Sequence, residues 1–198
     1  KKTINSSELK NKEFLSFNLS PSQKIILIKL KKNQSALENE KIGAKFFDYT
    51  KSNLFFSVAF FEQNIIQIKS NSKYFFDEFI LGVKLKSYEF NKYKTKKRDK
   101  DLMLELYIKK NQINFNKNKR FISLIEGSNF TKDLVSEPGN ILHPDEYAQR
   151  LKKLSKFGLK ITVYDEKKLK KMGMNALLGV GQGSIRGSYL VTMEWKGT

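Results

Sequence analysis

The last third of the sequence carries Pro, Gly and Asp at the points where one apolar periodicity changes into another. Pro144 suits the first position of a helix, where its missing N–H is not needed, and Gly158 suits the left-handed position that ends one. Asp165 can cap a second, shorter helix, which Gly173 closes. This punctuation predicts two helices between residues 144 and 173.

Two strands complete this region. Leu159, Ile161 and Val163 alternate with polar residues, which is the period of a strand, and Tyr189–Trp195 is a second apolar strand. Helix, strand, helix, strand is typical of the start of a parallel α/β sheet. Two strands alone make a marginal sheet in water, so we expect residues 128–198 to be cut from a larger domain.

The first half predicts a smaller α/β domain. We expect a strand at Lys24–Leu30 and a hairpin formed by Leu54–Phe61 and Ile65–Ile68. Apolar residues at helical spacing predict a helix over Tyr74–Phe90, and strict alternation predicts a strand over Leu102–Ile108.

The polar segment Asn111–Arg120 predicts a domain boundary, and a helix is expected from Lys119 to Glu137, ending because Pro138 disfavours a helical residue before it. The expected organisation is an N-terminal α/β domain with a mixed sheet at residues 1–115 and a connecting helix at 116–138. The incomplete start of a larger α/β domain, also with a mixed sheet, follows at 139–198.

The 198 residues have a formal net charge of +18, most of it before residue 128. Such a charge suits a nucleic-acid binder. Only four of the 38 cations are Arg, however, and readers of bases and phosphates favour its planar fork. The abundance of Lys, Asn, Ile and Phe favours a compositional drift instead. The densest run, Lys92–Lys100, is interpreted as a solvated loop.

Few residues could carry chemistry. The chain has no Cys, which excludes disulfides, Cys-ligated zinc and thiol catalysis. It has a single His. His143 precedes Pro144 at a helix start, so a local backbone role is expected. The adjacent acids at positions 145–146 and 165–166 fall in first helical turns, where the macrodipole accounts for them. We therefore assign no catalytic, metal-binding or cofactor-binding residue.

The most conspicuous local pattern is Gly179-Val180-Gly181-Gln182-Gly183-Ser184. Alternating glycines could let a backbone approach a phosphate. The third glycine comes one position early for G-x-G-x-x-G, and no Lys follows as in a Walker loop. A tight structural loop is expected here rather than a nucleotide site.

No segment predicts membrane insertion. The longest uncharged apolar stretch, near Leu54–Phe61, is far shorter than the ~18 residues that a span needs. The first residues lead into no apolar stretch of the kind that a signal peptide has. With the absence of Cys, this favours a cytoplasmic setting.

The order of features from Phe130 to Gly197 resembles the opening of the catalytic domain of leucyl aminopeptidases, the cytosol aminopeptidase family of two-metal exopeptidases. The features that carry the resemblance are Leu134-Val135, Pro138, Asn140, His143-Pro144, Gly173-Met174, Val180 to Ser184 and Trp195-Lys196-Gly197. Upstream, residues 82–94 are similar to a family helix that ends in Leu-x-Ser-Tyr-x-Phe-x-x-Tyr-Lys. Ser136-Glu137 and His143 depart from the family's Asn-Thr and Thr.

The resemblance implies that the intact protein is a metal-dependent aminopeptidase that removes Leu and similar residues from peptides. It implies two divalent metal ions, manganese or zinc, and a homohexamer. The family's metal ligands and its catalytic Lys and Arg follow the Lys-Gly that corresponds to Lys196-Gly197 here. The resemblance therefore places none of them on this chain, and residues 1–198 are expected to be inactive alone.

Two other interpretations stay open. The chain could be a basic nucleic-acid-binding α/β module, and DNA binding accompanies peptidase activity in some members of the family. It could also be a non-catalytic α/β domain in which the glycine turn is only structural.

Overall fold

The computed structural model describes residues 12–21, 23–31, 33–53, 57–59, 74–95, 105–107 and 118–197. The chain divides into two compact units, Lys1–Asn129 and Phe130–Thr198, and each is described by itself. The division falls within helix α4 (Lys119–Ser136). This helix confirms the one expected from Lys119 to Glu137. In the part that the structure describes, no helix is long and apolar enough to cross a membrane.

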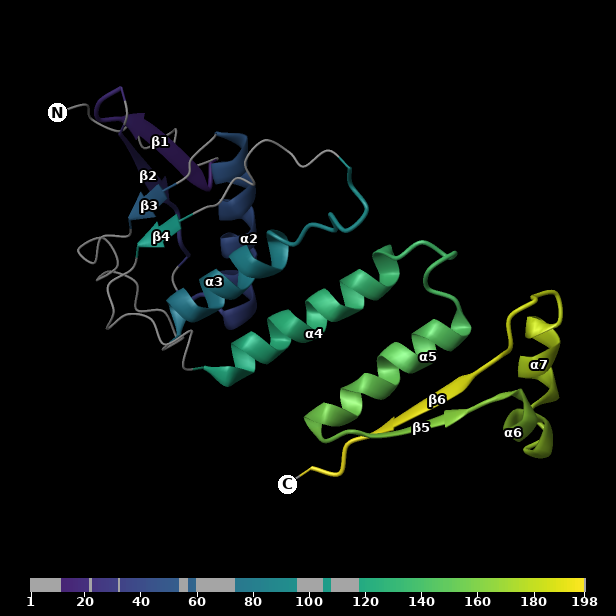
Figure 1. Ribbon diagram of the computed structural model, residues 1–198. Helices are drawn as coiled ribbons and strands as arrows, with labels where there is room; N and C mark the ends of the chain where they lie inside the picture. The colour runs from purple at the N-terminus through teal and green to yellow at the C-terminus, as the bar shows by residue number, and fades with distance from the viewer. Residues whose placement is uncertain are drawn as a thin grey trace. The chain divides into compact units, whose positions relative to one another are not determined.

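The first unit combines helices with short strands (Figure 1). Its elements before α4 are β1 (Phe14–Asn18), β2 (Lys24–Ile28), α2 (Ala36–Ser52), β3 (Ser57–Ala59), α3 (Phe75–Lys86) and β4 (Glu105–Tyr107). β1 and β2 are antiparallel, with Phe14 opposite Ile28, whereas β3 and β4 are parallel, with Val58 opposite Leu106. A mixed α/β architecture is thus confirmed.

The strands expected at Lys24–Leu30 and Leu102–Ile108 are confirmed where the structure describes them, as β2 and β4. Ser57–Ala59 is a strand, as expected, and its described partner is the parallel strand β4. The turn and second strand of the expected hairpin, up to Ile68, lie outside the described residues.

Helix α2 is absent from the sequence-based expectations, although its start carries a capping box. The Ser35 hydroxyl accepts a hydrogen bond from the Glu38 N–H, and the Glu38 carboxylate accepts one from the Ser35 N–H at 3.0 Å. The S-x-x-E spacing is a sequence signature of this motif. Polar residues interrupt the apolar stripe of α2, whose buried face includes Asn39 and Thr50, so periodicity alone does not reveal it.

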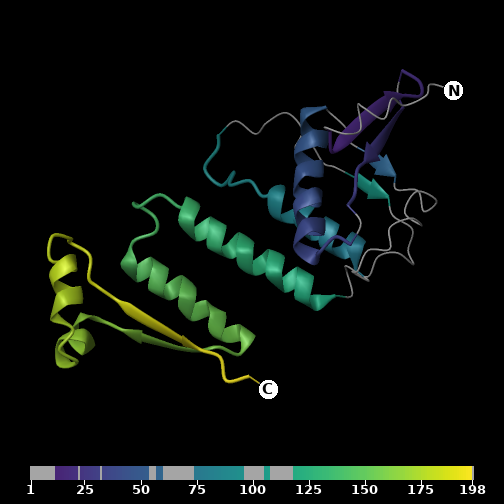
Figure 2. The same ribbon diagram turned by 180° about the vertical axis from the view of Figure 1, so that it is seen from behind.

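The core of the first unit lies where α2 and α3 cross (Figures 1 and 2). A Cβ on Gly43 would collide with the backbone oxygen of Phe79, and one on Gly82 would collide with that of Glu40. The two backbones therefore approach to a separation that only glycine allows. Beside this crossing, Phe46 and Phe79 are fully buried with ring centroids 5.2 Å apart.

Apolar residues of all four described strands pack against this helix pair. They are Phe14 of β1, Ile26 and Ile28 of β2, Val58 of β3 and Leu106 of β4. Helix α3 confirms the helix expected at Tyr74–Phe90 but ends earlier, at Lys86. Its C-cap Ser87 donates its backbone N–H to Val83 and its hydroxyl to the Lys84 carbonyl.

The second unit contains the expected helix, strand, helix and strand, with helix α7 as an addition. Its elements are α5 (Pro144–Lys152), a 3-10 turn η4 (Lys153–Phe157), β5 (Lys160–Tyr164), α6 (Glu166–Lys171), α7 (Asn175–Gly181) and β6 (Leu190–Glu194). Gly158 and Gly173 are left-handed, with φ of 88° and 71°, as their positions require. Asp165 caps α6 by accepting from the Lys168 N–H at 3.0 Å. These local predictions are confirmed.

The expectation of a parallel pair in this unit is wrong. β5 and β6 are antiparallel, with Tyr164 opposite Leu190 and Lys160 opposite Glu194. The cause is the connection between them. α6 begins directly after β5 and is followed by α7, and the returning chain is held beside α6 because the Ser188 N–H donates to Glu166 Oε1 at 3.1 Å. The chain therefore leaves and rejoins the sheet at one end, which forces the strands to run in opposite directions.

Candidate functional site

Five charged or titratable side chains of the second unit that form ion pairs lie on or beside α5: Glu137, His143, Asp145, Glu146 and Arg150. Pro144 occupies the first turn, and His143 is the extended N-cap residue, with φ of −91° and ψ of 169°. Its backbone carbonyl accepts the first intrahelical bond from Tyr147 at 2.9 Å. Asp145 and Glu146 lie in the first turn, where the helix dipole favours negative charge.

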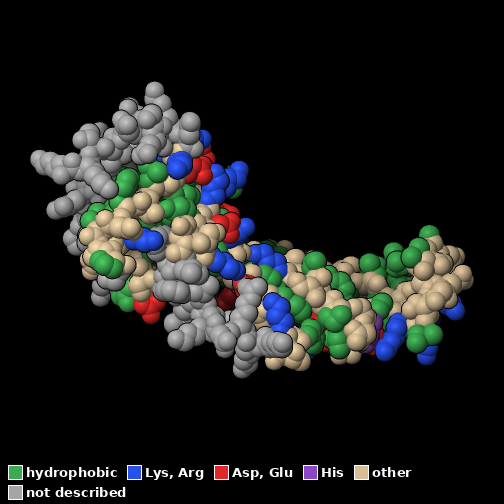
Figure 3. All heavy atoms as spheres, turned by 90° about the horizontal axis from the view of Figure 1, so that it is seen from above, with side chains coloured by type: hydrophobic (Ala, Val, Ile, Leu, Met, Phe, Trp, Pro, Cys, Tyr) green, Lys and Arg blue, Asp and Glu red, His purple; other side chains and the backbone are tan. Residues whose placement is uncertain are grey.

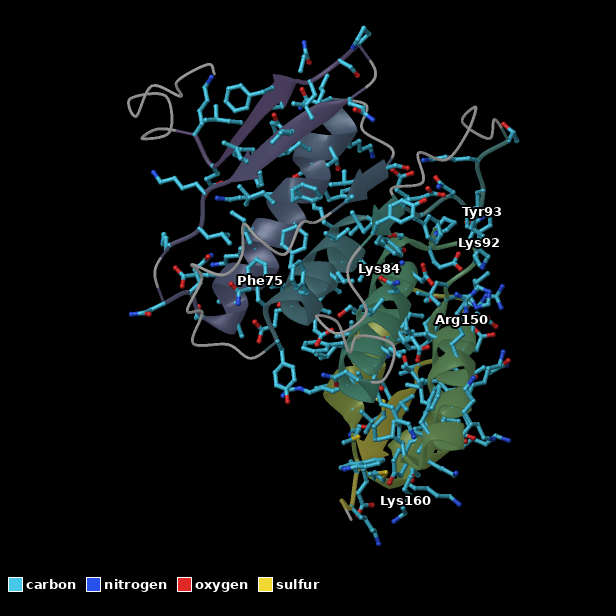
Figure 4. All side chains as sticks on the ribbon, turned by 90° about the vertical axis from the view of Figure 1, so that its left-hand side faces the viewer. Phe75, Lys84, Lys92, Tyr93, Arg150 and Lys160 are labelled. Carbon is cyan, nitrogen blue, oxygen red and sulfur yellow. The ribbon has the colours of Figure 1, made fainter. Side chains whose placement is uncertain are left out.

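Arg150, which is labelled in Figure 4, joins two acids. Its Nη1 donates to Glu137 Oε1 and its Nε donates to Glu146 Oε1, both at 2.8 Å. The Glu137 side chain is only 1% exposed and that of Arg150 18%. A buried carboxylate requires a partner of opposite charge, and the guanidinium supplies it. Hydrogen bonds from Arg150, with its charge, lower the pKa of the Glu146 carboxyl, and those to Glu146 and Glu137 raise the pKa of Arg150.

Asp145 forms a second pair of contacts. His143 Nδ1 lies 2.5 Å from one Asp145 oxygen, and Arg186 Nη1 lies 3.5 Å from the other. Partial burial raises the pKa of the Asp145 carboxyl. The hydrogen bond to His143, the backbone N–H of Asp145 and the charges of His143 and Arg186 outweigh this and leave the pKa below its ordinary value.

The arrangement suits a structural role. The carboxylates of Glu137, Asp145 and Glu146 each contact a guanidinium, so none is poised as a neutral acid or an uncommitted base. Among the described residues there is no group of three His, Asp or Glu side chains that could hold a metal ion. These residues therefore do not fit the metal centre that the family resemblance implies.

The glycine pattern adopts a different structure from the expected loop. Its first residues, Gly179 to Gly181, form the end of α7, and only Gln182 to Ser184 turn back, with the Ser184 N–H bonded to the Gly181 carbonyl at 3.0 Å. A Cβ on Gly181 would collide with the Ser188 hydroxyl, so this glycine permits a close approach of chain to chain.

Sequence reasoning missed the Glu137–Arg150 pair. The rarity of Arg in this Lys-rich chain was a signal for such a pair. The planar guanidinium group of Arg can bond one carboxylate with two N–H groups or join two carboxylates. Two of the four arginines, Arg150 and Arg186, are in the cluster around α5. Glu137 and His143, both departures from the family pattern, belong to the same cluster.

Each described unit combines helices with strands, and in the second unit Glu137, Asp145 and Glu146 are joined to two arginines. Comparison with known proteins points to the same family as the sequence. Residues 129–198 match the model of the cytosol aminopeptidase family, catalytic domain. The resemblance inferred from the sequence is thereby confirmed.

Curated relatives extend the match upstream. The chain is 45% identical over 126 residues to the probable cytosol aminopeptidase of Phytoplasma mali and 43% identical over 124 residues to that of Phytoplasma australiense. Over 120 residues it is 41% identical to the probable cytosol aminopeptidase of Rhodopseudomonas palustris. These alignments cover 59–61% of this chain and 24–25% of the relatives. The chain thus spans about a quarter of the length of the relatives it matches.

Solved structures show the same fold at lower identity. A variant of tomato leucine aminopeptidase aligns with a TM-score of 0.71 at 21% identity, covering 95% of this chain and 40% of the other. The bottromycin maturation enzyme BotP in complex with Mn aligns with a TM-score of 0.69 at 15% identity, covering 96% of this chain and 42% of the other.

Proposed function

We propose that the intact protein is an aminopeptidase that hydrolyses N-terminal residues, Leu and similar side chains, from peptides. The observation that carries this proposal is the match of residues 129–198 to the catalytic domain of the cytosol aminopeptidase family. The identity of 45% to a probable cytosol aminopeptidase supports it. Because this chain spans about a quarter of such relatives, the activity is proposed for the whole protein.

The described residues supply the scaffold rather than the reaction. Two divalent ions, manganese or zinc, are the proposed cofactors, and the complex of BotP with Mn supports a divalent metal. Such ions polarise a carbonyl and activate water. The contribution of this chain is to place α5 against β5 and β6. We propose that residues 1–198 alone have no peptidase activity.

The intact enzyme is proposed to be a cytoplasmic homohexamer. Its chain is proposed to contain an N-terminal domain at residues 1–115, a connecting segment at 116–138 and the start of the catalytic domain from residue 139.

A leucyl chromogenic substrate tests both parts of the proposal. The longest polypeptide containing this sequence should release leucine in the presence of manganese, lose the activity with a chelator and regain it with added metal. Residues 1–198 should release none under the same conditions. Failure of the long polypeptide to turn over leucyl, methionyl and alanyl substrates contradicts the aminopeptidase, and chelator-sensitive turnover by residues 1–198 contradicts the inactivity of this part.

One surface of the first unit favours secondary DNA binding. Tyr93 is 47% exposed, the Lys92 ammonium lies 5.4 Å from its ring centroid, and Lys94 follows (Figure 4). A basic segment with an exposed ring can hold a strand by charge and stacking. A mobility-shift titration with Tyr93→Ala at two salt concentrations tests it. Binding that survives ~0.2 M salt and needs Tyr93 supports a dedicated site, whereas loss with salt and no effect of Tyr93 refutes one.

A further inference from the structure

Two amide side chains are buried at the start of α2, beside an acid of α3. Asn39 of α2 is fully buried, and Gln34, which precedes the N-cap Ser35, is 4% exposed. The Asn39 amide donates to Glu78 Oε2 at 2.8 Å and thereby joins α2 to α3. Gln34 Oε1 and Asn39 Oδ1 are both buried, and neither has a hydrogen-bond donor in the part of the chain that the structure describes.

The two amides occupy a pair of positions whose side chains meet in many helices. The capping box makes Ser35 the N-cap and Glu38 the third helical residue. Gln34 is therefore at N′ and Asn39 at N4, the positions where two apolar side chains pack together in a hydrophobic staple. Asn33, just before them, has a left-handed φ of 63°, which Asn tolerates better than most residues. This tight entry into α2 presents two amide oxygens where a staple has apolar groups.

Both oxygens require a donor. A buried acceptor without a partner bears the full cost of its lost hydration, and buried amides are therefore bonded to protein or to internal water. Figure 3 shows acidic and basic side chains side by side on the surface of the first unit, but Gln34 and Asn39 lie beneath that surface. A segment of the intact protein outside residues 1–198 would have to insert into this unit to supply the donor.

We propose that Gln34 Oε1 and Asn39 Oδ1 bind one internal water molecule, which donates one O–H to each oxygen. Water is neutral, its two hydrogens match the two acceptors, and internal waters satisfy buried polar groups in this way. The water completes a polar connection that runs from Gln34 through Asn39 to Glu78 and links the entry of α2 to α3.

A metal cation fits this site less well, although oxygens alone surround it. The positive end of the α2 dipole opposes a cation at the first turn. Two amide oxygens and one carboxylate, which already accepts from Asn39, are also fewer than the roughly six oxygens that Ca²⁺ takes.

Solution NMR on residues 1–198, of 23.1 kDa, provides the test. The side-chain amide protons of Gln34 and Asn39 should show cross-relaxation with water in both the laboratory and the rotating frame. The ratio of the two rates should be that of a water molecule bound for longer than the tumbling time of the protein. Oxygen-17 relaxation dispersion of the solvent then counts the long-lived waters, and Gln34→Met should lose one of them.

A matched control uses the same substitution at an exposed glutamine. Gln23 lies in the turn between β1 and β2, and Gln23→Met should leave the number of long-lived waters unchanged. The thermal midpoint should be equal in potassium, sodium and choline chloride at one ionic strength, because water requires no particular cation.

Three results overturn the proposal. One is the absence of long-lived cross-relaxation at both amides, and another is the same water count in Gln34→Met as in the parent. The third is a thermal midpoint that rises with potassium or sodium over choline and loses this dependence in Gln34→Met, which assigns the site to a cation instead. These measurements need no peptidase activity, so their outcome is independent of the proposed function.

Discussion

Arg150 Nη1 lies 2.8 Å from Oε1 of Glu137 and thereby joins the residue that follows α4 to the last turn of α5. A short turn separates Glu137 from the proline that starts α5, and the chain bends there, with Ile141 and Leu142 both bonded to the Pro138 carbonyl at 2.9 Å. The ion pair joins the two helices that this turn connects. Its contribution to the free energy of unfolding depends on both partners, because the Glu137 side chain is almost entirely buried.

Arg150→Ala removes the guanidinium that balances the charge of the buried Glu137 carboxylate, and the expected loss is about 3–5 kcal/mol of unfolding free energy. Replacing both groups, as in Glu137→Leu/Arg150→Met, should recover much of this, because no charge is left buried. Urea unfolding followed by circular dichroism measures the differences. As a control, Lys160→Ala breaks an exposed pair with Glu194 and should change stability by about 0–1 kcal/mol. A loss in Arg150→Ala no larger than in this control contradicts the assigned role.

Acid should weaken the start of α2 in a defined window. A hydrogen bond from the Ser35 N–H, assisted by Lys31 and the Ser35 hydroxyl, lowers the pKa of Glu38 from 4.5 to about 2. A lowered carboxyl pKa contributes stability that is present above the unfolded value of 4.5 and is lost as the pH falls through about 2. Carbon-detected NMR should show Glu38 titrating well below 4.5, and Ser35→Ala should move its pKa back toward 4.5.

Acid should also weaken the contribution of Asp145 to the stability of the second unit. Its pKa is below the ordinary 3.8, so its contribution is complete above that value and declines as the pH falls through the lower, folded value. The thermal midpoint of Asp145→Asn should therefore differ from that of the parent at neutral pH and converge with it in strong acid. Parallel curves at every pH would show that the carboxylate contributes nothing.

Two glycine-to-alanine substitutions should change the free energy of unfolding in opposite directions. Gly43→Ala places a methyl against the Phe79 backbone, which cannot yield without separating α2 from α3, so a loss of about 1–3 kcal/mol is expected. Gly127→Ala lies within α4, where the new Cβ would meet no atom within 4 Å beyond its chain neighbours and its own helical backbone, and should stabilise by about 0.5–1 kcal/mol because Ala is the better helix former. Stabilisation by both changes would contradict the close helix crossing.

Removing the N-cap of α6 tests the punctuation that the sequence displays. Asp165→Ala deletes the acceptor for the Lys168 N–H, and the expected loss is about 0.5–2 kcal/mol. Asp165→Ser and Asp165→Asn retain an acceptor at this position and should recover most of it. Equal losses in all three variants would contradict the capping role.

The sequence by itself determined the local elements of residues 119–197 apart from helix α7. Pro144, Asp165 and the left-handed Gly158 and Gly173 act through the sterics and hydrogen bonds of their own few residues, and those constraints hold in any surrounding fold. The family resemblance rests on the same local order. Capping at Ser35 and Glu38 was equally local and could have revealed α2.

Only the tertiary structure decided how these elements combine. The antiparallel pairing of β5 with β6 depends on where the chain returns after α7, and the crossing at Gly43 and Gly82 depends on residues far apart in the sequence. The pairing of Glu137 with Arg150 likewise requires the turn between two helices to close. Such contacts depend on the packing of the whole unit. A local sequence pattern therefore does not predict which distant residue will be its partner.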